Sequence, residues 1–597
     1  MTKLENHYFT LYSKWGPKTA NVYIQELAAE FCCTDRHAKT LIKNMQNNEW
    51  ISWQPNPGRG KVSTLTFLVD PHELEKQNVK SMIENGDIEN AFKWMENQKE
   101  LDSSIVKSLE DHFQWTPNHI HEEGLDVLRY PYYHPIHTFV PLEMSTNYEK
   151  HLGEQIFNRL LRYDNKTNSF IPEIAHDWAS FEDGLVWRFY LRKGVYFHDG
   201  SLLTSEVIKE NIEFWREYPL DGWKVCIFDE IEKIETPSPT VIELYLSKPT
   251  PLLLHLFTDY KSMIIPVSTF KKNPDSFRNH PIGNGPYKVN KHEKGYIILE
   301  SFSNYFGYQP LLDKIELFHI PTSPVSRKKE VKYRIAKHYS NSIKQYKWVQ
   351  PELGGIYLVV NHQREGIHTH PKFKKMLSYS LDRPKLFQGH PHHDVSFPDS
   401  FFDETTNDLR QQSKIKKAKK WLQKKGVTTL TLSFICFEHE NDFGFELERL
   451  TKYFRQLGIT LNTTIVTIHD LAAMKQHLKQ TDLIISGMNL TENHLVSMLN
   501  ALSSSTSIIR NTLSYDVKRH LDFMLADVRH AESTEIAYQQ MRQVESFLFD
   551  HYYVIFLYQR KINITIEADD KLEGIELNHY NQLNYQKLWY KLGKSND

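Results

Sequence analysis

The sequence predicts a multidomain α/β protein, and three observations support this fold class. At 597 residues the chain exceeds the size at which one hydrophobic core stops growing, so several domains are expected. Residues 21–67 show helical periodicity followed by two short β-like runs, which indicates a small helical unit with a hairpin. From Leu128 the texture changes to short β-like runs separated by Pro, Gly, Asn and Asp, with helices between them.

The composition favours packed globular domains and limits the kinds of partner. Hydrophobic residues make up 40% of the chain and aromatic residues 13%, which is enough for well-filled cores. The 72 basic and 74 acidic residues nearly cancel, so the chain as a whole is not a polycation. Any surface that binds nucleic acid must therefore be local.

The sequence also predicts a soluble, cytoplasmic protein without a membrane partner. The N-terminal run MTKLENHYFTLYSKWG has charges every few residues and lacks the apolar stretch of a signal peptide. No later segment approaches the roughly 18 uncharged apolar residues that a membrane span needs. The four cysteines have the spacing of neither a disulfide framework nor a zinc site: Cys32, Cys33, Cys226 and Cys436.

Two helices are expected at the N-terminus. Within Asn21–Cys33, apolar residues recur at helical spacing: Val22, Ile24, Leu27, Ala28 and Phe31. Thr34 is a good N-cap for a second helix, and Asp35 is favourable in its first turn. This second helix buries residues spaced i, i+3, i+4, i+7, namely Ala38, Leu41, Ile42 and Met45.

The polar side of this second helix and the hairpin after it predict a winged helix-turn-helix that binds double-stranded DNA. The helix presents Thr34, Arg36, His37, Lys39, Thr40 and Lys43, side chains that reach phosphates and base edges in a major groove. Strands are expected at 50–53 and 62–67, with Arg59 and Lys61 at the tip between them, where a wing contacts DNA. The simpler alternative is a helical domain with a solvated basic face; the local surplus of base favours DNA binding.

A polar, charged connector follows at residues 71–115. Its scattered apolar residues predict two or three helices interrupted near Gly86–Asp87. The sequence leaves two roles open, a passive spacer or an element that transmits a signal between domains.

The N-terminal segment resembles a known family of regulators. The run ELAAEFCCTDRHAKTLIKNMQ, the paired tryptophans and the GRGK tip are similar to the N-terminal domain of SgrR-type transcriptional regulators. The resemblance covers about the first hundred residues and places the recognition helix at Thr34–Gln46. The segment GIELNHYNQLNYQKLWY near the C-terminus also resembles SgrR-type endings.

The rest of the chain resembles the family 5 extracellular solute-binding proteins, which bind oligopeptides and related solutes. The similar segments are IPEIAHDW, WRFYLRKGVYFHDG, the helix start at Thr204, the GNGPY turn at 283–287, Asn361, KFKKMLSYSLDR, and the strand–helix–strand unit at 428–466. The resemblance covers roughly residues 128–590. It implies a bilobal, type II periplasmic-binding-protein-like domain, whose lobes close around a ligand by hinge motion. The expected domains are a winged helix at 1–70, the connector at 71–115 and a solute-binding-like domain at 116–597.

The resemblance implies a ligand-contact segment in the second lobe. Peptide-binding members place an acidic residue just after a Gly-Trp step, and the matching run here is DLIISGMNLTE at 482–492. Met488 replaces the tryptophan and Thr491 stands at the acidic position, a departure that puts capture of a peptide amine in doubt. Asn489 and Glu492 become the candidate contacts for a small polar effector, which could be a sugar, a sugar phosphate or a peptide. The alternative is a surface loop without ligand contact.

Two further clusters have ordinary explanations. The histidines of HPHH at 390–393, with His368 and His370, could ligate a metal, but neighbouring Pro and Gly favour a solvated loop, so no metal is expected. Lys414–Lys425 predicts an amphipathic helix with a solvated basic face, and an accessory DNA contact is the alternative. The sequence contains no phosphate-binding loop, dinucleotide motif or nucleophile elbow, so neither an enzyme nor a cofactor is predicted.

These predictions together favour a cytoplasmic transcription regulator that senses a small polar solute. One alternative is the solute-binding component of a peptide or nickel-type ABC transporter, with the N-terminal domain a remnant. Another is a scaffolding protein that binds no ligand.

Overall fold

The computed structural model describes most of the chain. The described residues are 3–17, 19–56, 62–85, 87–96, 102, 104–105, 107–109, 125–132, 136–144, 146–164, 167, 169–218, 228–293, 295–319, 330–334, 343–352, 354–390, 394–402, 415–426, 428–436, 444–467, 476–490, 493–504 and 507–591. The chain divides into two compact units, of which the first comprises Met1–Thr116 with Glu293–Gly295 and the second comprises Pro117–His292 with Tyr296–Asp597.

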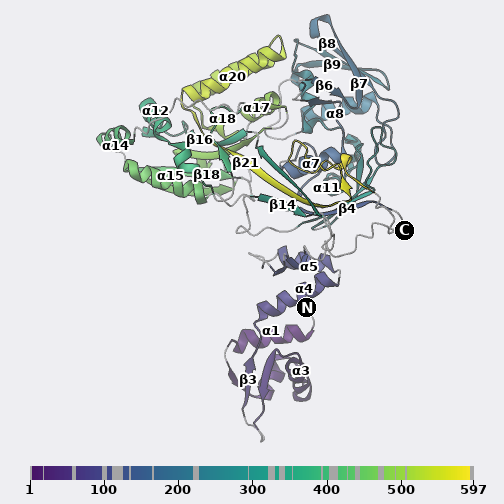
Figure 1. Ribbon diagram of the computed structural model, residues 1–597, viewed down its shortest axis with the longest axis vertical. Coiled ribbons are helices and arrows are strands. Elements are labelled where there is room, and N and C mark those ends of the chain that lie inside the picture. Colours follow the sequence, from purple (N-terminus) through teal and green to yellow (C-terminus); the bar gives the residue numbers. More distant parts are fainter. Residues whose placement is uncertain are drawn as a thin grey trace. The chain divides into compact units, whose positions relative to one another are not determined.

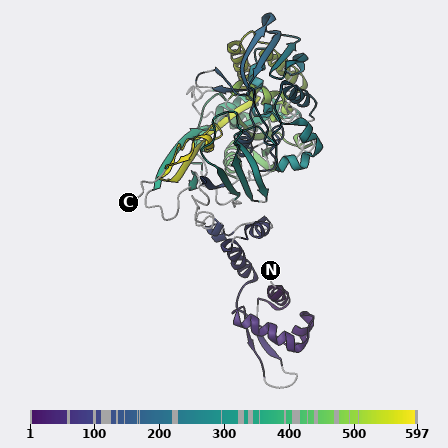
Figure 2. The ribbon, with the colours of Figure 1, turned by 90° about the vertical axis from the view of Figure 1, so that its right-hand side faces the viewer.

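The first unit holds a three-stranded antiparallel sheet and several helices (Figures 1 and 2). Its elements are α1 (Lys3–Trp15), β1 (Ala20–Val22), α2 (Ile24–Glu30), α3 (Asp35–Asn47), β2 (Ile51–Gln54), β3 (Ser63–Phe67), α4 (Pro71–Glu84) and α5 (Ile88–Glu96). The strand order is β1-β3-β2, so β3 lies in the middle of the sheet. The hairpin of β2 and β3 and the helix pair α2–α3 have the sequence order of a winged helix-turn-helix.

The structure corrects one predicted element in this unit. Asn21 and Val22 were expected to begin the first helix, but they lie in β1, where Val22 pairs with Ser63. The helix starts after Tyr23, which has extended backbone and donates its backbone N–H to Glu26 at 2.8 Å. The apolar side chain of Val22 is still buried in the core of this unit.

Two separate apolar clusters stabilise this unit. The larger one collects residues from Tyr8 to Leu74 around the helix pair and the sheet. A smaller one joins α4 and α5 to Ile105 and Leu109, and it also contains Val79, Ile83, Phe92 and Met95. Helices are therefore present on both sides of Gly86–Asp87, as the sequence predicts.

The second unit begins with a lobe that we call the first lobe, residues 125–319 with 570–591. Its strands are β4 (Val127–Tyr132), β5 (Leu161–Asp164), β6 (Ser169–Pro172), β7 (Ala175–Phe181), β8 (Val186–Leu191), β9 (Ile231–Ser238), β10 (Val241–Leu246), β11 (Tyr287–Glu293), β12 (Tyr296–Ser301), β13 (Lys314–His319), β22 (Leu572–Glu573) and β23 (Trp589–Tyr590). Its helices are α7 (Asn147–Ile156), α8 (Ser205–Glu217), α9 (Leu253–Leu256), α10 (Val267–Lys272) and α11 (Pro274–Asn279), with 3-10 turns η1 (Glu182–Gly184), η2 (Phe228–Glu230), η3 (Tyr260–Ser262) and η7 (Tyr585–Lys587). The two main sheets have the strand orders β7-β8-β10-β9 and β11-β12-β13-β4.

The second lobe, residues 354–558, is built on a mixed sheet. Its elements are β16 (Gly354–Val360), η5 (Ile367–Thr369), α12 (Pro371–Ser380), α13 (Arg383–Phe387), β17 (Asp394–Ser396), α14 (Ile415–Lys424), β18 (Thr429–Cys436), α15 (Gly444–Leu457), β19 (Thr460–Thr467), β20 (Leu483–Asn489), α17 (His494–Ser503), α18 (Ile508–Thr512), α19 (Tyr515–Arg529), α20 (Thr534–Asp550) and the start of β21 (Val554–Asp569). The strand order is β14-β21-β16-β20-β18-β19, and β15 (Ile343–Pro351) and β17 also pair with β21; β14 spans Glu330–Arg334.

Strand alternation divides the second lobe into two layers. In β16, Leu358 belongs to the cluster beneath α12, α14 and α15, whereas its neighbour Val359 belongs to the cluster that contains α17–α20 and the first lobe. In β20, Ile485 and Ile484 divide in the same way. Successive side chains of a strand point to opposite faces, so α12, α14 and α15 cover one face of the sheet and α17–α20 cover the other.

Long strands connect the two lobes. The first part of β21 pairs with β16, and the rest pairs with β15 and β14. The chain then enters residues 572–590, whose Leu572 and Tyr585 belong to the same cluster as the first-lobe core. This arrangement fits the two lobes and crossover strands that the family resemblance implies.

Candidate nucleic-acid interface and solute site

Helix α3 begins at a well-formed cap. The Thr34 hydroxyl accepts a hydrogen bond from the backbone N–H of His37 at 3.4 Å, and Asp35 lies in the first turn. Such a cap satisfies one of the free N–H groups of a helix start, and an acidic first turn complements the helix dipole. Local sequence therefore fixes where this helix starts.

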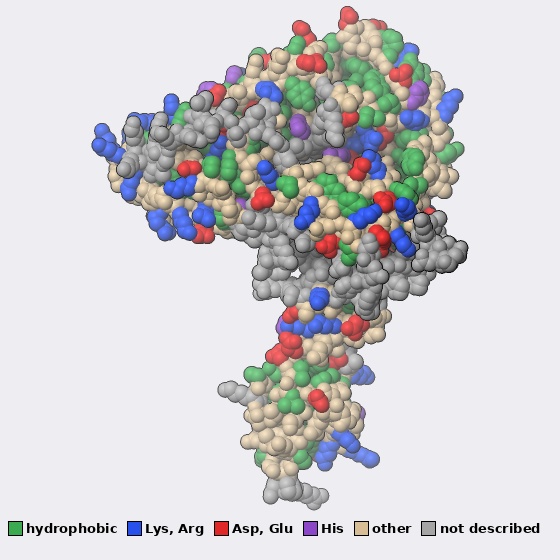
Figure 3. Space-filling view, in the orientation of Figure 1, with side chains coloured by type: hydrophobic (Ala, Val, Ile, Leu, Met, Phe, Trp, Pro, Cys, Tyr) green, Lys and Arg blue, Asp and Glu red, His purple; other side chains and the backbone are tan. Residues whose placement is uncertain are grey.

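The predicted DNA-contact residues of α3 lie on one exposed face. Ala38, Leu41, Ile42 and Met45 are buried in the core of the unit. The exposed positions include every predicted contact on this helix: Thr34, Arg36, His37, Lys39, Thr40 and Lys43. The Thr40 hydroxyl donates to the Arg36 carbonyl at 3.2 Å, and its oxygen can still accept a hydrogen bond. Figure 3 shows basic side chains gathered on the α3 side of this unit.

The wing is described only in its strands. β2 packs against α3, and Ile51–Gln54 pairs with Thr64–Phe67 in antiparallel register. Arg59 and Lys61, predicted at the tip, lie outside the described residues.

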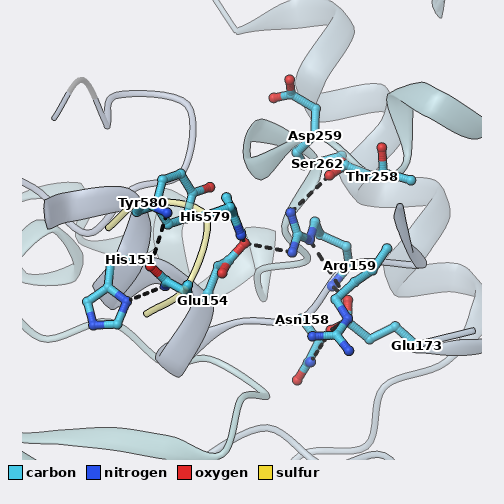
Figure 4. Close-up of polar contacts among 12 residues, drawn as sticks. His151, Glu154, Asn158, Arg159, Glu173, Thr258, Asp259, Ser262, His579 and Tyr580 are labelled. Carbon is cyan, nitrogen blue, oxygen red and sulfur yellow. Dashed lines mark hydrogen bonds and ion pairs between the residues drawn. The ribbon is translucent and has the colours of Figure 1, made fainter. Parts of the chain in front are cut away.

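A buried polar cluster in the first lobe forms the candidate solute site (Figure 4). Arg159 is at its centre, 8% exposed. Its guanidinium donates to the Thr258 carbonyl at 2.9 Å and to Glu154 Oε1 at 2.7 Å, and its Nε lies 3.9 Å from Glu173 Oε2. A guanidinium divided between two carboxylates and a carbonyl is held rigidly.

Glu173 connects this centre to the neighbouring chain segment. Its carboxylate accepts the Arg159 backbone N–H and the Asn158 side-chain amide, both at 2.8 Å. Asn158 in turn donates its backbone N–H to the side chain of buried Asn284 at 2.6 Å. A Cβ at Gly283 would lie 1.9 Å from the Ile156 carbonyl, so this close approach requires glycine in the GNGPY turn.

Helix α7 supplies the other side of the cluster. It starts with a capping box in which Thr146 and Glu149 bond reciprocally to each other's backbone N–H. Further along, Glu154 Oε1 lies 3.4 Å from His579 Nε2, on the C-terminal segment. Burial opposes ionisation of Glu154, but His579, Arg159 and Arg162 outweigh it and hold the pKa of that carboxyl well below its usual range.

The cluster also contains neutral and cationic groups with altered proton affinity. Burial lowers the pKa of His151 to about 3, and its Nε2 atom is buried without a hydrogen-bond partner among the described atoms. Burial also lowers the pKa of Lys261 to about 8, although Asp259 opposes the shift. Lys150 lies with its ammonium 4.7 Å from the centre of the Tyr260 ring. Unused hydrogen-bonding capacity in such a site is available to a polar ligand.

The second lobe reaches this cluster through Asn493. Its side chain caps α17 by accepting the Val496 N–H at 3.3 Å, and its amide donates to His255 Nδ1 at 2.7 Å and to Thr258 Oγ1 at 3.2 Å. Thr258 is the residue whose carbonyl accepts from Arg159. Contacts therefore pass from the second lobe to the centre of the cluster in two steps.

The predicted ligand contacts lie in the sequence just before Asn493. Asn489 ends β20, where its backbone pairs with Gly354. Glu492 lies outside the described residues. Asn493 itself, Arg159 and Glu154 carry no motif that the sequence analysis singled out. The signal that could have found Asn493 is its position as an N-cap directly after the predicted ligand-contact segment.

Three more contacts join the lobes on the same side of the second-lobe sheet. His255 Nε2 lies 3.4 Å from Thr534 Oγ1, and His530 Nε2 lies 3.1 Å from Glu230 Oε1. Tyr163 and Tyr538 are also linked by a side-chain hydrogen bond. Helices α19 and α20 thus contact the first lobe at several points.

The histidine-rich segments differ from the solvated loop that the sequence favours. His390 is buried and lies 3.1 Å from Glu446, and His368 is buried against the Asn361 carbonyl at 2.9 Å. Residues 391–393 lie outside the described part of the chain. Within the described part, no group of three or more His, Cys, Asp and Glu side chains has an arrangement that could hold a metal ion.

Two other structural features bear on function. No helix among the described residues is both long and apolar enough to cross a membrane.

A surface hollow of about 420 Å³ lies on the first lobe, lined by His176, Tyr190, Arg192, Lys193 and Phe306 among others. It is open to solvent and shares no residue with the buried cluster.

Comparison with known proteins identifies two family models along the chain. Residues 169–509 match the bacterial extracellular solute-binding proteins, family 5 Middle, and residues 3–116 match the sugar transport-related sRNA regulator N-term. A curated relative, the HTH-type transcriptional regulator SgrR of Yersinia enterocolitica, is 26% identical over 487 residues, which covers 82% of each chain. The same regulator of Photorhabdus laumondii is 32% identical over 320 residues, covering 54% of this chain and 55% of the relative.

Solved structures show the same fold for the second unit. NikA from Brucella suis, in complex with Fe(III)-EDTA, superposes with a TM-score of 0.63 at 15% identity, covering 78% of this chain and 100% of that one. The dipeptide binding protein from Pseudoalteromonas sp. SM9913, in complex with Met-Leu, gives a TM-score of 0.60 at 16% identity with the same coverage.

Proposed function

The chain belongs to the family 5 bacterial extracellular solute-binding proteins with an SgrR-type N-terminal region, and we propose that it is a cytoplasmic transcription regulator. In this proposal the N-terminal winged helix binds double-stranded DNA, and the bilobal unit senses a small polar solute. The proposed domains are residues 1–70, the connector at 71–115 and the solute-binding-like domain at 116–597.

The observation that carries the proposal is the exposed polar face of α3 in a chain that also has the solute-binding fold. Arg36, Lys39 and Lys43 project from one side of a helix whose other side is buried. A helix that follows a tight turn and presents basic side chains in this way suits the major groove of DNA. The named relatives, which are HTH-type regulators, support the same role.

The buried cluster supports a polar and uncharged solute, with a sugar as the first candidate. Its cations have nearby carboxylates, since Arg159 contacts Glu154 and Glu173, and Asp259 interacts with Lys261. A phosphate group would have to compete with these carboxylates for the same cations. The matched model for the N-terminal region, described as sugar transport-related, supports a sugar over a peptide.

Closure of the two lobes is the proposed sensing step. A solute that binds the closed form more tightly shifts the population toward it, and only this difference in affinity can act as a signal. The connector, with its own small apolar cluster, is the proposed route to the DNA-binding helix. Proposed targets are genes of a sugar transporter or a small regulatory RNA near the gene of this protein.

The named relatives are regulators and binding proteins, and the proposed function is binding without catalysis. A role as the solute-binding component of an ABC transporter is favoured less, because it gives the exposed basic side chains of α3 no partner. The relatives that match across both regions of the chain carry the name of a transcription regulator.

The test is binding of the full chain to a fluorescent duplex from its own promoter region, measured by anisotropy over a range of salt concentrations. We expect affinity well above that for a random duplex and a decline with salt that reports phosphate contacts. Equal, weak binding to both duplexes would contradict the proposal. A thermal-shift screen of sugars, sugar phosphates and short peptides then identifies the solute, because a ligand of the native state raises the melting temperature.

A further inference from the structure

Three helices of the second lobe bury their apolar sides in a single cluster. α12 contributes Phe373 and Leu377, α14 contributes Ala418 and Leu422, and α15 contributes residues that include Leu450 and Phe454. Since all three helices pack on the same face of the sheet, their polar sides are turned to solvent together. This face of the sheet is opposite to the one that carries α17 and the contacts with the first lobe.

The solvent side of these helices is strongly basic. The exposed cations, which we call the basic face, are Lys372, Lys375, Lys419, Lys420, Lys424, Lys425, Lys452 and Arg455. The exposed carboxylates of α12, α14, α15 and the neighbouring α13 cap are Glu448, which pairs with Lys452 at the same surface, and Asp382, which caps α13. Figure 3 shows Lys and Arg side chains gathered over α14 and α15 at the left of the view.

The four lysines of the α14 segment are the most available of these charges. Among the described residues no carboxylate lies within ion-pair distance of Lys419, Lys420, Lys424 or Lys425. A cluster of like charges destabilises the native state through mutual repulsion. The local charge of these lysines therefore suits a polyanionic partner, although the net charge of the whole chain is only −2.

The neighbouring apolar side chains distinguish between kinds of polyanion. The large aromatic of α14, Trp421, is partly buried beneath Lys372, whose ammonium lies 5.8 Å from its ring centre, and beside His370 at 5.5 Å. No large hydrophobic side chain is exposed on the described parts of α12, α14 or α15. Insertion into a membrane surface needs exposed apolar residues, and single-stranded nucleic acid needs aromatic platforms for its bases. Duplex DNA needs only cations for its phosphates.

We infer that the basic face is a second DNA-contact surface, which binds the phosphates of double-stranded DNA without reading the sequence. This inference rests on the proposed function and adds to it a partner surface in the sensing unit. Phosphate contacts fix register and orientation on the duplex, whereas base contacts determine sequence preference. The basic face therefore contributes affinity and salt dependence, and α3 contributes specificity.

The test compares two full-length variants that remove equal charge. In the first, Lys419, Lys420, Lys424 and Lys425 are replaced by Gln, a good helix former that keeps α14 folded. The matched control replaces exposed lysines of the first lobe: Lys193→Gln, Lys248→Gln, Lys271→Gln and Lys272→Gln. Both variants lose four positive charges, so any difference between them comes from location. Binding to a promoter duplex of about 100 base pairs is followed across about 50–200 mM KCl, where phosphate contacts have their largest effect.

We expect the α14 variant to bind at least about ten-fold more weakly than the control, and its plot of log affinity against log salt to be flatter by about 3–4, since each phosphate contact contributes about 0.9. Its preference for promoter over random duplex should remain. In a background carrying Arg36→Ala and Lys39→Ala, residual salt-dependent binding should persist and should disappear when the α14 lysines are also replaced.

Equal affinity and equal salt dependence of the α14 variant and the control would overturn the inference. So would lysine-dependent binding to phosphatidylserine vesicles or single-stranded RNA with no change on duplex DNA. A wild-type protein that binds no duplex at all would instead contradict the proposed function, so the two failures can be distinguished.

Discussion

Asn493 and His255, which are 238 residues apart in the sequence, are joined by a hydrogen bond of 2.7 Å from the asparagine amide to the Nδ1 atom of the histidine. The contact links the start of α17 in the second lobe to α9 in the first. Because the amide donates, His255 Nδ1 must be unprotonated, and the other ring nitrogen is left to face Thr534 Oγ1 at 3.4 Å. The bond between the lobes therefore depends on a neutral imidazole.

The first prediction is that acid weakens the second unit. Burial lowers the pKa of His255 to about 4, so the folded protein resists a proton that the unfolded chain accepts near pH 6.5. The resulting stability is complete above about pH 6.5 and is lost as the pH falls toward 4. Buried His151 and the partly buried His198 and His362, whose pKa values are also lowered, act in the same direction. Thermal melting should show a lower melting temperature at pH 5 than at pH 7.5, and the fall should be smaller in His255→Gln. An equal fall in both proteins would exclude His255 as a source.

A second prediction separates the two roles of Asn493. Asn493→Ser keeps a side-chain acceptor that caps α17, but its hydroxyl is too short to reach His255. We expect the free energy of unfolding to fall by about 1–2 kcal/mol, since a buried histidine is left without its donor. Asn493→Ala also removes the cap and should lose about 1 kcal/mol more. Urea denaturation measures both variants. If Asn493→Ser is as stable as the wild type, the contact between the lobes contributes nothing.

Helix α3 could be predicted from sequence because all of its signals are local. These signals all lie within one helix and its first turn: the cap at Thr34, the spacing of the buried Ala38, Leu41 and Met45, and the exposed basic side chains. The sequence predicts Asn21 and Val22 as helical because Val22 continues the apolar stripe of the helix. Their strand exists only through pairing with Ser63–Leu65, which no local pattern reveals.

The buried cluster could not be predicted for the same physical reason. Arg159 meets Thr258, 99 residues away, and Glu154 meets His579 on the C-terminal segment. Each of these residues is an ordinary polar residue in its own segment, and the fold alone brings them together. The family resemblance points to residues 482–492 of the second lobe as the ligand-contact segment, and the residue that follows it, Asn493, contacts the first lobe.

The third prediction concerns the buried charge of Arg159. Arg159→Met removes the guanidinium that donates to Glu154 inside a buried site, which should cost about 3–5 kcal/mol of the free energy of unfolding. Arg162→Met is the matched control, because Arg162 also lies near Glu173, at 3.8 Å from Oε1, but its side chain is half exposed to solvent. We expect a loss below about 1 kcal/mol for this variant. Similar losses for the two variants, measured by urea denaturation, would contradict the central role of Arg159.

The fourth prediction tests the proposed DNA-contact face of α3 with a control in the same unit. Lys39 and Lys3 are both exposed lysines, but Lys39 lies on the polar face of α3 and Lys3 begins α1. Lys39→Ala removes a charge-assisted contact to DNA, so affinity for the promoter duplex should fall about ten-fold, which corresponds to about 1.4 kcal/mol. If the lost partner is a phosphate, the slope of log affinity against log salt concentration should also become shallower by about 0.9. Lys3→Ala changes the net charge equally and should stay close to the wild type. Anisotropy titrations with the full chain measure both variants, and equal weakening by the two substitutions would mean that the charge of the unit, rather than the face of α3, determines DNA binding.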